Sequence, residues 1–453
     1  MLTRLILLAT LFLTLLPAVG HAQQQQKRSF IPHAEVEKNK RANATPHLQA
    51  AGIAPDSVRV HLLMDNSLNA FVAGGLNMFL HTGLLIRSEN ASQLIGVMAH
   101  ETGHIAGGHL ARMQDAAGNA STEALVAMLL GAAVGVASGR GDVGSAIALG
   151  GQDVAVRNIL AYSRMEESSA DQAAVKYLDT THQSARGLLE FFDILGDQDL
   201  LVATRQDPYV RTHPLTRDRV AFIRDHVARS PWSDAPPRPE FAEMHRRMRA
   251  KLFAFLEPPA RTLQRYKEED QALDARYARA IAYYRKPDME KALPLIDGLI
   301  AERPQDPYFQ ELKGQMLFEN GRGGEAVEPY RKAAELLPDN ALLQMEVGQV
   351  LVEQDDPTLL DEAQKRLNQA TRQEPDNSTA WRLLSVAYGR EGDEGMAAYA
   401  MAEQSLLENR LTDANFLAGK AERLLPKTGS VWLRIQDIKE QTSQAQDDRK
   451  RKR

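Results

Sequence analysis

The sequence predicts a mostly α-helical protein in which an α-rich globular domain with a small β-sheet is followed by an α-solenoid. Three observations support this prediction. A strand-like stretch precedes a helical pattern near residue 100, prolines cluster between residues 230 and 259, and a helical template recurs beyond them. The 453 residues, 43% of them apolar, suffice for two or three globular domains. The formal net charge of −5 is close to neutral for this length and does not suggest a nucleic-acid-binding protein.

The first residues, "MLTRLILLATLFLTLLPAVGHAQ", have the pattern of a secretory signal peptide. Arg4 supplies the positive start, residues 5–16 are apolar, and small residues precede the expected cleavage after Ala22. This apolar stretch is short for a membrane span, although a retained anchor is the alternative interpretation. Residues 1–22 are therefore expected to be removed from the mature protein.

The sequence contains no cysteine. This excludes a lipoprotein, which needs a cysteine at its cleavage site, and it excludes a metal site built on thiolates. A metal bound by this chain must therefore be held by histidine and carboxylate groups.

The first part of the mature chain is predicted to contain a helix and then strands. Residues 23–50 are polar and are expected to form a lead-in helix. Residues 58–85 are rich in β-branched and aromatic side chains, with a break at Gly74-Gly75, which predicts two strands joined by a turn. The second strand is expected at residues 77–81.

The stretch "GVMAHETGHIAGGHL", residues 96–110, has the spacing of a metal-binding helix. His100 and His104 are four residues apart, so on an α-helix they lie about 40° from each other and can reach one zinc ion. Glu101 lies beside them, where a general base for a zinc-activated water belongs. His109 is displaced from His104 by about 140° around a continuous helix, so it is excluded as a ligand.

The residues before this motif indicate that it lies on a helix. Asn90 is a favourable N-cap, Gln93 follows it as in a capping box, and Leu94, Val97 and Met98 form an apolar stripe at helical spacing. The alternative is a buried helix that carries two surface histidines.

A third ligand is needed for a catalytic zinc, and residues 162–178, "YSRMEESSADQAAVKYL", offer candidates. Glu167 and Asp171 share one face of a predicted helix, so one carboxylate can bind the metal while the other hydrogen-bonds a ligand imidazole. The alternative is a solvated acidic face that also includes Glu166.

Residues 124–138, "ALVAMLLGAAVGVAS", form an uninterrupted apolar run. The run is short for a membrane span. A buried core helix is one interpretation, and a helix at the mouth of the site or on a membrane surface is the other.

Beyond the proline-rich stretch one template recurs: Ala, an apolar residue four positions later, Ala or Leu three later, and Pro five later. The matches are Ala292/Ile296/Leu299/Pro304, Ala326/Tyr330/Ala333/Pro338, Ala363/Leu367/Ala370/Pro375 and, out of phase, Ala414/Ala418/Ala421/Pro426. The first two steps, 34 and 37 residues, are typical of tetratricopeptide repeats. An unrelated helical bundle is the alternative. Tetratricopeptide repeats form a solenoid whose concave face binds peptides or partner proteins.

These patterns divide the chain as follows. The predicted segments are a signal peptide at 1–22, a domain that carries the metal-binding motif at 23–255, a linker helix at 256–275, tetratricopeptide repeats at 276–441 and a basic tail at 442–453.

The HETGH motif, the Glu-x-x-Ala-Asp of the second helix and the preceding "NAFVAGGLNMFLHTGLL" resemble the zinc metallopeptidase family of the CAAX prenyl protease and HtpX. The signal peptide and the repeats make the chain similar to the periplasmic BepA-type proteases of that family. The resemblance implies a zincin-like fold, with one zinc ion per chain bound by His100, His104 and Glu167. It implies that Glu101 is the general base and acid.

The resemblance also implies roles around these ligands. Asp171 would be the carboxylate that orients a ligand imidazole. "THPLTRDRV", residues 212–220, matches a further family motif, and His213 would be able to take the fourth position on zinc and hold the enzyme shut. His213 and Arg219 are also candidates for stabilising the oxyanion. In the protein that gives this group its name, cysteines bridge the two domains, whereas this chain has no cysteine, so any fixed coupling between its domains must be non-covalent.

The implied function is a periplasmic zinc-dependent endopeptidase with chaperone-like activity in the quality control of outer-membrane protein assembly. Its implied partners are unfolded or misassembled outer-membrane proteins and, through the repeats, the assembly machinery. Peripheral contact with a membrane is compatible with this function. The substrate is expected to lie along an edge strand at residues 77–81. One alternative is a latent protease that acts mainly as a tetratricopeptide scaffold or chaperone, and another is a zinc hydrolase such as an amidase.

Overall fold

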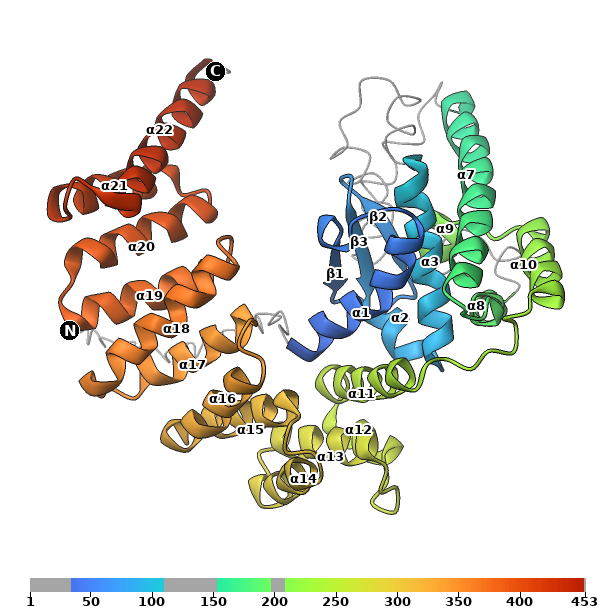
Figure 1. Ribbon diagram of the computed structural model, residues 1–453, viewed down its shortest axis with the longest axis horizontal. Coiled ribbons are helices and arrows are strands. Elements are labelled where there is room, and N and C mark those ends of the chain that lie inside the picture. The colour runs from blue at the N-terminus through green and yellow to red at the C-terminus, as the bar shows by residue number, and fades with distance from the viewer. Residues whose placement is uncertain (1–33, 110–152, 197–207, 452–453) are drawn as a thin grey trace, which may run out of the picture. The chain divides into compact units, whose positions relative to one another are not determined.

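The computed structural model describes residues 34–109, 153–196 and 208–451. The expected signal peptide, the apolar run 124–138 and the last two residues of the basic tail therefore lie outside the described residues. The predicted fold class is confirmed: helices dominate, with one small sheet in the N-terminal part (Figure 1). None of the helices that the structure describes combines the length and apolar character of a membrane-spanning segment.

The sheet contains strands β1 (Arg59–Leu63), β2 (Ala70–Ala73) and β3 (Asn77–His81) in the order β1-β3-β2. Strand β3 runs parallel to β1 and antiparallel to β2. The prediction of two strands, with residues 77–81 at an edge, was therefore wrong. The described sheet has three strands, and residues 77–81 form the middle one.

The local sequence explains this difference. Gly74 and Gly75 have φ angles of 56° and 85°, and this left-handed turn joins β2 to β3 as expected. A second turn divides the residues before it, because the Asp65 side chain accepts a hydrogen bond of 2.8 Å from the backbone N–H of Ser67. Gly83 packs on this turn: a Cβ there would lie 2.2 Å from the Asn66 carbonyl oxygen.

Helix α3 lies between the sheet and α7 and also packs on α8 (Figure 1). These three helices and the sheet supply most of the first hydrophobic core. The helical segments of this part are α1 (Ala34–Ala50), η1 (Pro55–Ser57), α2 (Thr82–Arg87), α3 (Ala91–Gly107), α7 (Asp153–Thr180), α8 (Arg186–Leu195), α9 (Pro208–Thr212) and α10 (Arg217–Arg229).

Helix α11 (Pro239–Leu256) belongs to two cores. Phe241, Met248 and Leu252 pack in the first core, whereas the residues on the other side of the helix pack against α13. The boundary predicted at residue 255, between the N-terminal domain and the linker helix, therefore lies at the end of α11. Both hydrophobic cores include residues of this helix.

Buried charges connect α11 to both parts. Lys251 is fully buried, and its Nζ lies 3.3 Å from Glu35 Oε2 on α1 and 3.7 Å from Glu311 Oε2 on α15 (Pro307–Glu319). Arg247 lies 2.8 Å from Glu35 Oε1 and also pairs with Asp306. Because an unpaired buried charge is costly, this network favours a fixed arrangement of α1, α11 and α15.

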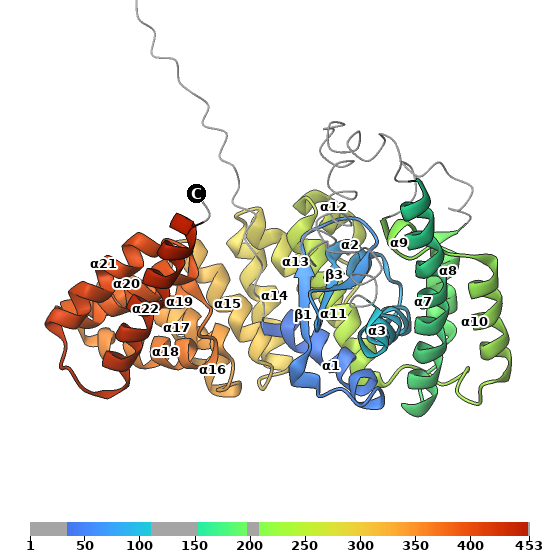
Figure 2. The same ribbon diagram turned by 90° about the horizontal axis from the view of Figure 1, so that it is seen from above.

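From α12 onward, consecutive helices pack against one another along the chain (Figure 2). They are α12 (Pro259–Arg265), α13 (Leu273–Arg285), α14 (Met289–Glu302), α15, α16 (Gly323–Leu336), α17 (Ala341–Glu353), η4 (Pro357–Leu359), α18 (Leu360–Gln373), α19 (Ser378–Glu391), α20 (Glu394–Leu407), α21 (Leu411–Leu424) and α22 (Gly429–Arg451). Residues 442–451, expected to be a basic tail, continue α22.

The recurring template marks the contacts between the repeat helices. Its alanine, aliphatic and tyrosine positions are all at most 4% exposed, including the out-of-phase match in α21. Gly314 and Gly348 allow close helix crossings, since a Cβ at these positions would lie 2.7 Å from the Tyr330 ring and 2.4 Å from Leu367. Small residues therefore recur where helices approach one another most closely.

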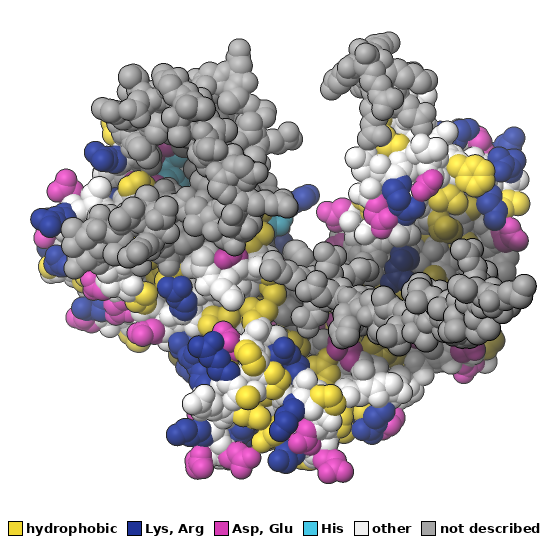
Figure 3. Space-filling view, turned by 180° about the vertical axis from the view of Figure 1, so that it is seen from behind, with side chains coloured by type: hydrophobic (Ala, Val, Ile, Leu, Met, Phe, Trp, Pro, Cys, Tyr) yellow, Lys and Arg dark blue, Asp and Glu magenta, His cyan; other side chains and the backbone are white. Residues whose placement is uncertain are grey.

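On the face shown in Figure 3, acidic and basic side chains are interspersed over the described surface, with apolar side chains between them. Arg303–Glu243 and Arg331–Glu362 are examples of the surface ion pairs.

Candidate metal centre

Helix α3 carries His100, Glu101 and His104 and begins with a reciprocal cap. The Asn90 side chain accepts a hydrogen bond from the Gln93 backbone N–H, and the Gln93 side chain accepts one from the N–H of residue 89. The apolar stripe predicted for this helix is buried. Local sequence therefore determines where the helix starts and which face it buries.

A close helix crossing brings α7 to this motif. A Cβ added at Gly103 would lie 2.8 Å from the carbonyl oxygen of Ala170, so only glycine allows the backbones to approach this closely. Ala170 is itself fully buried. The crossing places Glu167, one turn before Ala170, opposite the two histidines of α3.

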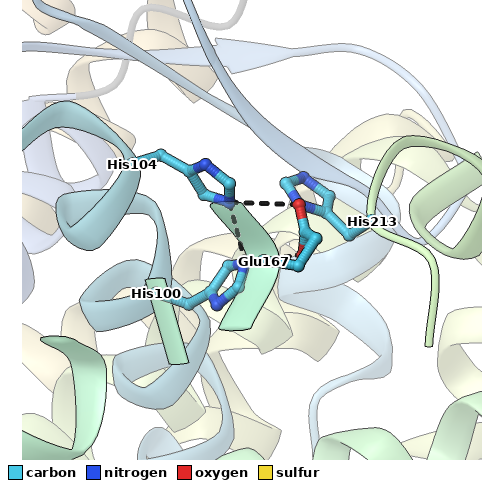
Figure 4. A group of neighbouring side chains, drawn as sticks. All are labelled: His100, His104, Glu167 and His213. Atoms are coloured by element: carbon cyan, nitrogen blue, oxygen red, sulfur yellow. Dashed lines mark hydrogen bonds and ion pairs between the residues drawn. The ribbon is translucent and has the colours of Figure 1, made fainter. Parts of the chain in front are cut away.

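Four side chains converge at this crossing (Figure 4). Glu167 Oε2 lies 3.3 Å from His100 Nε2, and Glu167 Oε1 lies 3.3 Å from His104 Nε2 and 3.0 Å from His213 Nδ1. The Nε2 atoms of His100 and His104 are 3.1 Å apart. One ligand atom from each residue lies within 4.8 Å of the others, and all four residues are buried.

This arrangement fits a divalent metal ion. Tetrahedral ligand atoms about 2 Å from zinc lie about 3.3 Å from one another, which is close to the separations around Glu167. Imidazole nitrogens and a carboxylate oxygen are donors that zinc accepts. Both carboxylate oxygens of Glu101 are buried without a hydrogen-bond partner among the described residues, beside the cluster but outside it.

Asp171 and Arg219 lie outside the four-residue cluster but contact two of its members, His100 and Glu167. Asp171 Oδ1 lies 2.9 Å from His100 Nδ1, so this carboxylate holds the ring nitrogen that faces away from Glu167. The Arg219 guanidinium donates two hydrogen bonds to Asp171 and lies 2.8 Å from Glu167 Oε2. Burial favours protonation of Asp171, but the Arg219 charge outweighs it and holds the Asp171 pKa below its usual value.

His213 joins the cluster from the residues that follow α9. Its Nε2 lies 3.1 Å from the Ala70 carbonyl oxygen on β2 and 3.5 Å from Glu101 Oε1. Its ring stacks on Tyr209, with the centroids 4.6 Å apart. His213 thus touches a predicted ligand, the predicted base and a sheet strand at once.

Glu101 is fully buried on α3. Burial raises the pKa of its carboxyl group, and the nearby His213 and His100 offset part of that rise. A general base works best when its pKa lies near the operating pH, so the direction of this shift suits proton transfer.

Sequence reasoning did not anticipate two neighbours of the site. Tyr209 was not singled out; it lies on the short helix α9, and its carbonyl oxygen accepts a hydrogen bond of 2.7 Å from the backbone N–H of His213, which follows that helix. His109 was excluded as a ligand, and the structure keeps it outside the cluster but against His104. The exclusion of His109 assumed that the helix continues through residue 109. The Gly107-Gly108 pair was the sequence signal that the helix ends before it.

Comparisons with known proteins agree with this architecture. Residues 35–227 match the model of peptidase family M48, and residues 260–307, 277–341 and 317–387 match tetratricopeptide repeat models.

Two of the named relatives match most of the chain, and a third matches part of it. The beta-barrel assembly-enhancing protease of Escherichia coli (strain K12) is 25% identical over 82% of this chain and 75% of its own length. The corresponding Yersinia pestis protein is 24% identical over 82% of this chain and 76% of its own length. Metalloprotease YcaL of Escherichia coli (strain K12) is 31% identical over 38% of this chain and 63% of its own length. The chain therefore carries a peptidase family M48 domain, which makes it a metalloprotease, and tetratricopeptide repeats follow that domain.

Proposed function

We propose that this chain is a periplasmic zinc-dependent endopeptidase, with one zinc per chain, that cleaves unfolded or misassembled outer-membrane proteins. The observation that carries the proposal is the buried cluster of His100, His104 and Glu167 beside the carboxylate of Glu101. The names of the relatives support the substrate class. The predicted signal peptide supports the compartment.

Each residue of the site has a separate role in the proposed hydrolysis of a peptide bond. A bound divalent ion supplies Lewis-acid activation of water and of the peptide carbonyl. Glu101 accepts a proton from the attacking water as the new C–O bond forms, and it delivers that proton to the amine when the C–N bond breaks. Asp171 fixes the orientation of His100 through Nδ1, and Arg219 neutralises the excess negative charge of Asp171 and Glu167.

We place the extended substrate along β2 instead of β3. Among the strands that the structure describes, β3 pairs on both sides, whereas β2 has one sheet neighbour and also contacts α3. The Ala70 carbonyl of β2 lies 3.1 Å from His213 Nε2, so this strand borders the cluster. Backbone pairing with an edge strand is sequence-tolerant, which suits a protease of misassembled proteins.

The experiment that tests this function measures hydrolysis of an unfolded casein-type substrate by the purified chain before and after removal of metal. We expect the metal-free protein to be inactive and stoichiometric Zn²⁺ to restore hydrolysis. Tryptophan fluorescence of both forms controls for unfolding. Undiminished hydrolysis in a folded, metal-free protein would exclude the proposal.

A second candidate function is a latent protease that acts mainly through its repeats as a scaffold or chaperone, docking on the outer-membrane assembly machinery. The observation that favours it is the position of His213, which contacts both Glu167 and Glu101. With three protein ligands zinc keeps an open position for water, whereas a fourth ligand closes the site. Pro214 keeps His213 out of a regular helix, so a loop movement suffices to open the centre.

Replacing His213 by Ala distinguishes a latch from a catalytic donor. If His213 is a latch held by roughly 1.4 kcal/mol, His213→Ala should raise hydrolysis and self-cleavage about tenfold. If it stabilises the oxyanion, the same change should lower kcat by roughly 10²- to 10³-fold with zinc still bound. The measurement is the rate of casein hydrolysis together with metal content. His226→Ala on α10 is the control, and an unchanged rate in His213→Ala removes this residue from the mechanism.

A further inference from the structure

His109 contacts the metal-binding helix from beyond its end. The Nδ1 atoms of His109 and His104 are 2.9 Å apart, and the two rings meet nearly perpendicularly, with centroids 4.9 Å apart. His109 is 3% exposed. The contact lies on the side of His104 opposite Nε2, the atom that faces Glu167.

The backbone turns at Gly108 to make this contact. Gly108 has φ 61°, and its N–H bonds to the carbonyls of His104 and Ile105, so α3 ends in a left-handed cap. In a continuous helix His109 would lie about 140° from His104. The left-handed residue redirects the chain and brings the His109 ring back to His104.

Gly107 leaves the space that the His109 ring occupies. A Cβ built on Gly107 would lie 2.2 Å from His109 Nε2 and 2.6 Å from its Cδ2. Any larger residue at position 107 must displace the ring. Both glycines therefore allow the contact between His109 and His104, because Gly108 redirects the chain and Gly107 leaves room for the His109 ring.

We propose that His109 is a positioning residue of the metal centre, whose ring accepts the Nδ1 proton of His104 and so presents His104 Nε2 to the metal. An imidazole that binds metal through Nε2 carries its proton on Nδ1, and that N–H needs an acceptor when it is buried. Only an unprotonated nitrogen accepts, so His109 carries its own proton on Nε2. This inference rests on the proposed metal centre.

The two ligand histidines are then oriented in the same way by different groups. Asp171 holds His100 Nδ1 at 2.9 Å, and His109 holds His104 Nδ1 at the same distance. Outer partners of this kind typically contribute about 10- to 100-fold to metal affinity. Loss of His109 should therefore weaken metal binding without removing a ligand.

The test compares two replacements of His109 with different acceptor chemistry. His109→Leu keeps apolar bulk without an acceptor, and His109→Asn keeps an acceptor oxygen close to the position of Nδ1. Cobalt(II) is titrated into the metal-free full-length proteins, with its visible absorption as the readout and chelator competition to obtain Kd. We expect Kd to rise about 10- to 100-fold in His109→Leu and to stay within about threefold of the unmodified chain in His109→Asn. Gly107→Ala, which displaces the ring, should resemble His109→Leu.

The unfolding midpoint of each metal-free protein separates positioning from packing. A weaker Kd in His109→Leu with an unchanged midpoint, together with recovery in His109→Asn, supports the proposal. An unchanged Kd in His109→Leu overturns it, as does a Kd in His109→Asn that is as weak as in His109→Leu. If the unmodified chain binds no cobalt or zinc at all, the proposed metal centre itself fails, and that outcome is distinguishable from the other two. His226→Ala serves as the histidine control.

Discussion

Replacing Glu101 by Gln is expected to reduce peptide-bond hydrolysis by about 10²- to 10⁴-fold while metal content stays unchanged. Gln has nearly the same volume, so the fully buried site keeps its packing. It cannot accept a proton from water, however, and the reaction loses its base. Glu101 lies outside the group of side chains that surround Glu167, which is why metal binding should persist.

The measurement pairs casein hydrolysis with metal analysis of the same samples. Glu166→Gln is the matched control, because it makes the same chemical change at a buried glutamate beside Glu167. Full hydrolysis by Glu101→Gln with metal bound would show that another group is the base. Loss of metal in that variant would show that Glu101 is instead a ligand.

Replacing Glu167 by Ala is expected to abolish stoichiometric metal binding, and hydrolysis with it. Glu167 is the carboxylate whose oxygens lie within 3.3 Å of His100, His104 and His213. Without it the two histidines of α3 lack their third partner, and two histidines alone do not hold a catalytic zinc. We expect a loss of metal affinity larger than the 10- to 100-fold that outer partners contribute.

This change also removes one of the carboxylates that pair with Arg219, and breaking a buried ion pair costs about 3–5 kcal/mol. Glu167→Gln preserves the volume, so a comparison of the two variants separates ligand loss from destabilisation. Glu166→Ala is the positional control. A folded Glu167→Ala protein that retains one metal per chain would disprove the assignment of this residue as a ligand.

Much of the fold and of the centre was predictable because it depends on short-range spacing. The i,i+4 pair of histidines, the Asn90 cap and the apolar stripe of α3 all follow from the period of a helix. The same holds for Glu167 and Asp171 on α7 and for the recurring alanines of the repeats, which are buried as their spacing predicted. In these cases the relevant residues lie within a few turns of one helix.

The strand order of the sheet could not be predicted from local sequence patterns. Residues 58–85 carry a clear strand signal, but the Asp65 turn that divides them is a short polar sequence, and only its contact with Gly83 makes it evident. The position of β3 in the middle of the sheet depends on pairing with β1, whose register is not encoded in either strand alone. This is why the substrate edge that we propose is β2 instead of β3.

The sequence by itself determined which helices carry the candidate ligands and which face of each helix they occupy. Tertiary structure decided which of these side chains meet. Glu167 reaches the histidines because Gly103 lets α7 approach α3. Arg219 couples Glu167 to Asp171 from helix α10, 48 residues beyond Asp171 along the chain. His109 reaches His104 because Gly108 leaves the helical path. Helical periodicity depends on local backbone geometry, whereas these contacts depend on packing between distant segments and on one residue with positive φ, and no local period encodes either of them.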